Sequence, residues 1–131
     1  MNDLPLWVKQ QNDKSFPASI MAKDWNTLLP ISDYDLSAAD SANYEHSIVG
    51  EKTVTFPHKL HTLDSAKYES FKYTPFANTY TFNMAKAAIE NEKPGSNNVT
   101  DFLTISISST DYAGHWFGPN SRDRRYLFTP G

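Results

Sequence analysis

Asp111 and His115 are the residues whose types and spacing best suit metal chemistry in this 131-residue chain. They lie four residues apart in the stretch SSTDYAGHWFGPNS, with Gly114 between them. Because glycine adopts backbone conformations that side chains exclude, we expect a sharp turn there that lets both side chains converge. A carboxylate and a neutral imidazole are ordinary zinc ligands, and a catalytic zinc typically takes about three protein ligands. The pair therefore predicts part of a zinc site.

The spacing also fits a purely structural reading, in which Asp111 caps a turn and His115 is a surface histidine. The position of the pair after an apolar run favours chemistry, because ligands of open α/β sheets gather beyond the carboxyl ends of the strands. On the residues alone, both readings stay open.

Two predicted elements position this loop. Residues 79–92 predict a helix, with Asn78 or Thr79 as its N-cap and a Lys-Pro-Gly stop after it. Residues 101–108, DFLTISIS, form a short apolar run rich in β-branched side chains, which is typical of a buried strand. Helix, strand and polar loop together predict a unit of an α/β sheet. The expected apolar face of the helix consists of Phe82, Ala85 and Ile89.

The first half of the chain predicts shorter elements. Apolar residues at helical spacing indicate one helix near Trp7 and a second from Met21 to Leu29, ended by Pro30. Residues 31–49 are polar and irregular, which predicts a long surface segment. Alternating residues at 52–56 predict a half-exposed strand, ended by a proline.

The composition argues against several classes of partner. The net charge is -3, and no stripe of Lys and Arg alternates with stacking aromatic residues, so nucleic acid is not an expected partner. Because cysteine is absent, any metal would need His, carboxylate or carbonyl ligands. The chain lacks a run of about 18 apolar residues and the basic and apolar stretches of an export signal, so no membrane contact is expected.

Other histidine and aromatic residues favour structural roles. His58 and His61 form an H-x-x-H pattern, but Pro57 precedes them and no carboxylate ligand pattern surrounds them, so we interpret both as surface histidines. Trp7, Trp25 and Trp116 suit a sugar or ligand platform in principle, although core and interdomain packing is the better interpretation.

The run DFLTISISSTDYAGHWFGPNS resembles the zinc-ligand segment of bacterial alkaline phosphatases of the phosphate-irrepressible type, in the type I phosphodiesterase and nucleotide pyrophosphatase group. The shared pattern is a strand followed by S-x-x-D-x-x-G-H-x-F-G-P-x-S. The resemblance continues upstream through NMAKAAIENE and, more loosely, through the first half of the chain. It implies an α/β fold: a piece of the parallel-sheet core, with a helical and irregular insertion.

The resemblance also implies a function. Asp111 and His115 would bind one of two zinc ions in a periplasmic or secreted enzyme that cleaves small-molecule phosphate monoesters through a phosphorylated Thr. That nucleophile and the remaining ligands are not found in this chain, and Thr79, Thr104 and Thr110 lack the nucleophile's context, so we assign them structural roles. The alternatives are a phosphodiesterase or nucleotide pyrophosphatase, and a noncatalytic binding module. The sequence does not indicate an oligomeric state.

We divide the chain into an insertion or cap-like segment at 1–77, the helix, strand and metal loop at 78–121, and an atypical tail at 122–131. The tail, RDRRYLFTPG, places three of the chain's twelve Lys and Arg residues within its first few positions. It departs from the acidic helix expected of the family, and Met1 falls where the family chain is mid-domain. We therefore expect an internal fragment with a non-native end.

Overall fold

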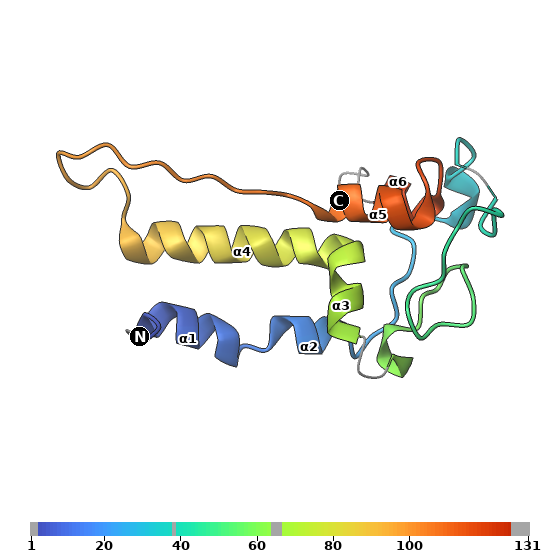
Figure 1. The fold of residues 1–131 in the computed structure, drawn as a ribbon, viewed down its shortest axis with the longest axis horizontal. Coiled ribbons are helices and arrows are strands. Elements are labelled where there is room, and N and C mark those ends of the chain that lie inside the picture. Colours follow the sequence, from blue (N-terminus) through green and yellow to red (C-terminus); the bar gives the residue numbers. More distant parts are fainter. Residues whose placement is uncertain (1–2, 38, 64–66, 127–131) are drawn as a thin grey trace.

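The computed structural model describes residues 3–37, 39–63 and 67–126. Within these ranges α1 and α2 lie beside α4 in one half of the molecule, while α5 and α6 pack near the irregular segments at the other end (Figure 1). The α-helices are α1 (Leu6–Asp13), α2 (Phe16–Ile20), α3 (Lys67–Ser70), α4 (Pro75–Glu92), α5 (Ser109–Phe117) and α6 (Arg122–Tyr126). The 3₁₀ helices are η1 (Ile31–Asp33), η2 (Leu60–Thr62) and η3 (Phe71–Tyr73).

Helix α4 confirms the strongest helix prediction but begins four residues earlier than expected. Thr74 takes the N-cap position and Pro75 follows in the first turn, where proline's fixed φ suits a helix and its missing N–H has no intrahelical partner to lose. The helix ends at Lys93, which adopts a left-handed conformation with φ of 48° and donates its backbone N–H to the Ile89 carbonyl. Local signals at both ends therefore fix the extent of α4.

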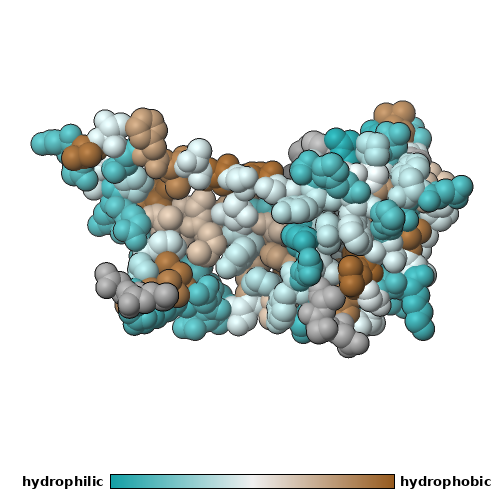
Figure 2. Space-filling model, in the orientation of Figure 1, coloured by the Kyte–Doolittle hydropathy of each residue, from teal (hydrophilic) through white to brown (hydrophobic). Residues whose placement is uncertain are grey.

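The apolar face predicted for this helix is not the face that packs inward. Phe82 and Ile89 are exposed, whereas Phe76 and Tyr80 pack against the core. Segment 94–107 runs back alongside α4 towards α5 (Figure 1). In Figure 2 apolar side chains line the upper edge of the molecule in this region.

Residues 101–107 of the predicted strand run as an extended segment (Figure 1) but form no β-ladder within the described residues. Its apolar side chains are exposed, and Phe102 is 93% exposed. A strand needs hydrogen-bonding partners on neighbouring strands. The only β-pairing among the described residues is the isolated antiparallel bridge between Trp25 and His58. The described residues therefore do not confirm a parallel-sheet core.

Two predictions for the first half of the chain are wrong. The segment from Met21 to Leu29 is not a helix, because Trp25 instead exchanges backbone hydrogen bonds with His58, at 2.8 and 2.9 Å. Residues 52–56 form bends rather than a strand, and the Phe56 backbone N–H donates to the Asp40 carboxylate at 3.1 Å. In both places tertiary contacts outweigh the local pattern. The helix expected near Trp7 is confirmed by α1.

The core lies where η3, α5 and the irregular segments meet. Trp25 and Phe117 are fully buried at its centre and contact each other edge to face, with 6.2 Å between ring centroids. Burial of aromatic side chains supplies much of the stabilisation of a domain this small. The core residues are Met21, Trp25, Ile48, Leu60, Leu63, Phe71, Tyr73, Ala113 and Phe117.

None of the helices in the described ranges combines the length and the apolar character needed to cross a bilayer.

Candidate metal centre

The predicted ligand pair lies on helix α5 rather than in a loop. Asp111 and His115 are four residues apart, and positions i and i+4 share one face of a helix. Oδ1 of Asp111 lies 3.4 Å from Nε2 of His115, and the two side chains are 75% and 82% exposed. The structure therefore brings the pair together on an accessible face, by helical spacing instead of a sharp turn.

Gly114 has a different role from the one predicted. It sits inside α5, and a Cβ atom built there would lie 3.3 Å from Nε of Arg124. The missing side chain therefore makes room for the Arg124 side chain against the helix. Arg124 is further held by a hydrogen bond from Nη1 to the Pro119 carbonyl at 2.8 Å.

The opposite side of α5 is anchored in the core. Ala113 and Phe117 are fully buried, while the Trp116 indole donates to the Ser47 carbonyl at 3.0 Å. The carbonyl of Trp116 in turn accepts a hydrogen bond from the His46 backbone N–H at 3.3 Å. The helix is thus fixed on one side and exposes its ligand-bearing face on the other.

The end of α5 depends on a glycine. Gly118 has a φ of 96°, and a Cβ atom at this position would lie 2.5 Å from the Tyr44 ring. Backbone conformation and close packing both require the absence of a side chain. The chain turns here into α6, where Ser121 Oγ donates to the Gly118 carbonyl and accepts from the Arg124 N–H.

Sequence reasoning missed a buried polar network beneath this helix, made of Glu51, His58 and Asp123. Nδ1 of His58 lies 2.8 Å from Oε2 of Glu51, and Nε2 lies 2.6 Å from Oδ1 of Asp123. The other Glu51 oxygen accepts the Lys59 backbone N–H at 2.6 Å. The His58 side chain is fully buried. The prediction of a surface histidine is therefore wrong for His58. It is confirmed for His61, which is exposed and lies 2.7 Å from Asp24.

The network carries charge in the core. Burial disfavours the charged imidazolium of His58, but hydrogen bonds to Asp123 and Glu51 outweigh it and raise the pKa of His58 from 6.5 to about 9. Because the folded-state value is the higher one, the resulting stability is fully present below pH 6.5 and is lost as the pH rises through about 9.

Further charged groups surround this network. Arg122 lies 3.8 Å from the Asp40 carboxylate, and both side chains are largely buried. Burial raises the pKa of Asp40 and that of Glu45 above their ordinary values, although each accepts a backbone hydrogen bond that acts in the opposite direction. The region therefore combines several carboxylates with the cations of His58 and Arg122.

Part of the predicted atypical tail belongs to this packed region. Residues 122–126 form α6, and Asp123 is fully buried against His58. Residues 127–131 lie outside the described residues. That residues 122–131 form a non-native end stays a prediction.

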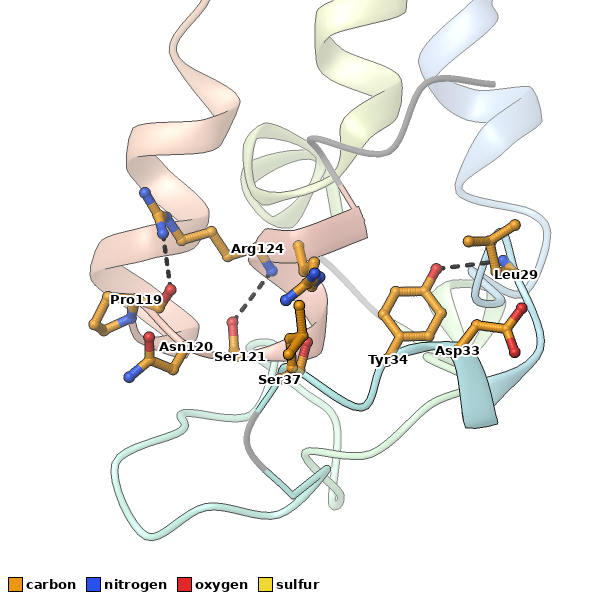
Figure 3. Close-up of a pocket in the computed structure, with 10 residues that line it drawn as sticks. Leu29, Asp33, Tyr34, Ser37, Pro119, Asn120, Ser121 and Arg124 are labelled. Atoms are coloured by element: carbon orange, nitrogen blue, oxygen red, sulfur yellow. Dashed lines mark hydrogen bonds between the residues drawn. The ribbon is translucent and has the colours of Figure 1, made fainter.

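A separate pocket of about 550 Å³ lies between η1 and the α5–α6 turn (Figure 3). Tyr34 accepts the Leu29 backbone N–H on one wall, and Arg124 with Ser121 forms the other. The lining residues do not include Asp111 or His115. The pocket is therefore distinct from the candidate metal ligands.

The donor chemistry of the pair fits zinc, because a carboxylate oxygen and an imidazole nitrogen are both ordinary ligands. Two such ligands fall short of the roughly three that a catalytic zinc takes. Across the part of the chain that the structure describes, no group of three or more His, Cys, Asp or Glu side chains is arranged to hold a metal ion. Asp111 and His115 thus fit as a partial ligand set.

The arrangement of these elements matches a segment of a solved alkaline phosphatase structure. The crystal structure of PafA superposes with a TM-score of 0.88 and 43% sequence identity, covering 98% of this chain and 25% of that one. The chain is homologous to a segment of alkaline phosphatases of the PafA and PhoV kind. Within the described residues, the segment that matches this structure consists of helices and irregular segments, and its α/β class stays a prediction.

The similar curated proteins include two alkaline phosphatases. Alkaline phosphatase PafA of Elizabethkingia meningoseptica is 47% identical over 120 residues, and PhoV of Synechococcus elongatus is 46% identical over 121 residues. These matches cover 91% and 92% of this chain and 22% of each relative. The chain thus spans about a fifth of their length. A Myroides odoratus protein named calcium-transporting ATPase is 50% identical over 124 residues, 92% of this chain and 23% of that protein. No protein-family model matches the sequence.

Proposed function

We propose that this chain supplies a ligand-bearing segment of the zinc centre in an alkaline phosphatase that hydrolyses phosphate monoesters. The observation that carries the proposal is the exposed pair of Asp111 and His115 on one face of α5, with 3.4 Å between Oδ1 and Nε2. Supporting it is the identity of 46–47% to two alkaline phosphatases over almost the whole chain.

Each residue has a defined part in this proposal. Asp111 presents a carboxylate oxygen and His115 a ring nitrogen, and the buried side of α5 holds both in place. When bound, zinc neutralises charge on the phosphate oxygens and stabilises the departing alkoxide. The phosphorylated Thr and the remaining ligands come from other parts of the enzyme, so Thr79, Thr104 and Thr110 keep structural roles.

The proposed partner is a small-molecule phosphate ester, and the proposed location is the periplasm or the exterior of the cell. Both follow from the resemblance to phosphate-irrepressible alkaline phosphatases. The chain's composition fits a small anionic substrate better than a polyanion, because its net charge of -3 provides no broad basic field.

The test is made in a full-length enzyme, obtained by placing this segment in PafA in place of its homologous segment. Asp111→Ala and His115→Ala should each reduce bound zinc and lower kcat/KM by at least about a hundredfold, since an incomplete ligand set no longer holds the ion. Zinc content by atomic emission and hydrolysis of 4-nitrophenyl phosphate measure the two effects.

A matched control is available in the same segment. Asp24 and His61 form another exposed Asp–His pair, with 2.7 Å between Oδ1 and Nδ1. Asp24→Ala and His61→Ala should leave zinc content and activity unchanged. Full zinc occupancy and wild-type turnover in the Asp111→Ala and His115→Ala enzymes would falsify the proposal.

Substrate preference is tested separately. The same enzyme should cleave a monoester faster than bis(4-nitrophenyl) phosphate, and ATP belongs in the comparison because the Myroides relative is named an ATPase. Faster turnover of the diester would favour the phosphodiesterase alternative. The 131-residue chain by itself should show negligible turnover, since it holds only part of a ligand set.

A further inference from the structure

The buried network of Glu51, His58 and Asp123 connects parts of the chain that are far apart in sequence. His58 and Asp123 are separated by 65 positions, and His58 also pairs its backbone with Trp25. The imidazole is packed between aromatic rings, with centroid distances of 5.1 Å to Trp25 and 4.7 Å to Phe56. His58 therefore joins the irregular segments around Trp25 and Glu51 to α6.

The hydrogen bonds of His58 require a proton on each of its two ring nitrogens. Both ring nitrogens of His58 face carboxylate oxygens, at 2.8 and 2.6 Å. A neutral imidazole has one N–H donor, so its other nitrogen would meet an oxygen lone pair. The arrangement is satisfied when the ring is an imidazolium that donates to Glu51 and Asp123.

The same network holds the end of the ligand-bearing helix in two ways. Phe117, the last residue of α5, is fully buried and lies 5.9 Å from the His58 ring, centroid to centroid. Asp123 belongs to α6, which follows α5 after a turn closed by the hydrogen bonds of Ser121. The other end of α5 is held separately, because Ser109 is buried and the Tyr112 ring lies 6.0 Å from the Tyr73 ring, centroid to centroid. The network therefore anchors the C-terminal end of α5, which is the end that carries His115.

We infer that Glu51, His58 and Asp123 form a positioning network that orients α5 and thereby sets the geometry with which Asp111 and His115 hold zinc. The inference rests on the proposed function, because it assigns a supporting layer to that site. Removing one partner of a buried ion network leaves the other charge uncompensated and destabilises the fold. The positioning role is therefore judged on the zinc affinity and turnover of folded protein, apart from the effect on stability.

The charges around His58 make the network dependent on pH. Its ring faces Glu51 and Asp123, while Asp40, Glu45 and Arg122 form the next group of charges. The ordinary pKa of His58 is raised to about 9 in this setting. Loss of the proton leaves a bare nitrogen against a carboxylate oxygen, so the hold on α5 weakens as the pH rises through that value.

The experiment uses the full-length chimaeric phosphatase with His58→Gln and, as a matched control, His61→Gln at the exposed histidine. His58→Gln should weaken zinc binding by about ten- to a hundredfold, the range seen when groups that orient metal ligands are removed. It should lower kcat with little change in KM at saturating zinc. His61→Gln should behave as wild type.

Zinc retention between pH 7 and pH 10 gives the readout that a merely structural role would not change. The wild-type enzyme should lose affinity around pH 9, and Asp123→Asn should move that loss to lower pH by about one unit or more, because one anionic partner is gone. His58→Gln should remove this component of the profile. If His58→Gln does not fold, the test rests on the pH profiles of zinc retention for the wild type and Asp123→Asn. Profiles that coincide would overturn the inference.

The outcomes separate this inference from the proposed function. Zinc loss in Asp111→Ala with unchanged zinc affinity and pH profile in folded His58→Gln would overturn the positioning role alone. Unchanged zinc content in Asp111→Ala would overturn the proposed ligand role and the inference with it. Lower thermal stability of His58→Gln with wild-type zinc affinity would also count against positioning.

Discussion

Gly118 illustrates how one residue can constrain the candidate site without taking part in its chemistry. It ends α5, has a φ of 96°, and packs its backbone against the Tyr44 ring. The ligand pair itself is highly exposed, so substitutions at Asp111 or His115 should cost the fold little. At the scale of single residues, stability and metal binding are therefore assigned to different positions.

Gly118→Ala should lower the free energy of unfolding by about 2 kcal/mol or more, since it combines backbone strain with a clash against an aromatic ring. Gly95→Ala is the matched control. Gly95 also has a positive φ, of 76°, but a Cβ atom there meets nothing within 4 Å. We expect a loss of about 1 kcal/mol at Gly95. Urea denaturation measures both, and equal losses would show that the Tyr44 contact is unimportant.

At the scale of elements, the accuracy of prediction follows how local the stabilising contacts are. Helix α4 is predictable because its periodicity and its Lys-Pro-Gly stop lie within the segment itself. Residues 101–108 have the composition of a strand, but extended backbone becomes a strand only when a neighbouring strand pairs with it. Helix α5 is not predicted from the sequence, because Gly114 suggests a turn. In the structure this glycine instead leaves room for the Arg124 side chain against the helix.

Lys93 allows a direct test of how α4 ends. Its φ of 48° is unfavourable for a residue with a side chain, and the residue is exposed. Lys93→Gly should therefore raise the free energy of unfolding by about 0.5–1 kcal/mol. Lys86→Gly, an exposed position inside the same helix, should lower it by about 1 kcal/mol. Denaturation curves that shift in the same direction for both variants would refute the assigned C-cap.

At the scale of the whole molecule, the buried and the exposed apolar residues lie in different regions. The core of α5, η3 and the irregular segments is closed around Trp25 and Phe117. Exposed apolar residues instead occur on α4 and along 99–107, where Phe102 and Val99 are the most exposed. Exposed apolar residues gathered on one face of a protein favour association.

Phe102 and Phe117 should respond in opposite ways to the same substitution. Phe102→Ala should leave the free energy of unfolding within about 0.5 kcal/mol and reduce self-association of the chain. Phe117→Ala should cost about 3–5 kcal/mol, because a fully buried ring is removed. Denaturation and sedimentation velocity measure the two effects. A large stability loss for Phe102→Ala would mean that segment 99–107 packs more closely than the structure shows.

The candidate site shows the limit of sequence reasoning over the whole chain. Asp111 and His115 could be proposed because they are close in sequence and lie in a run shared with a known family. Glu51, His58 and Asp123 carry no such signal, because their separations of 7 and 65 positions form no motif. Only the fold reveals that a histidine predicted at the surface is buried between two carboxylates.

The contact between Trp25 and His58 has a consequence for spectroscopy. The indole is fully buried and lies 5.1 Å from the imidazole, centroid to centroid. A protonated imidazole quenches the excited indole more strongly than a neutral one does. Emission from Trp25 should therefore brighten as His58 loses its proton, so that the chain contains its own fluorescent reporter of the buried charge.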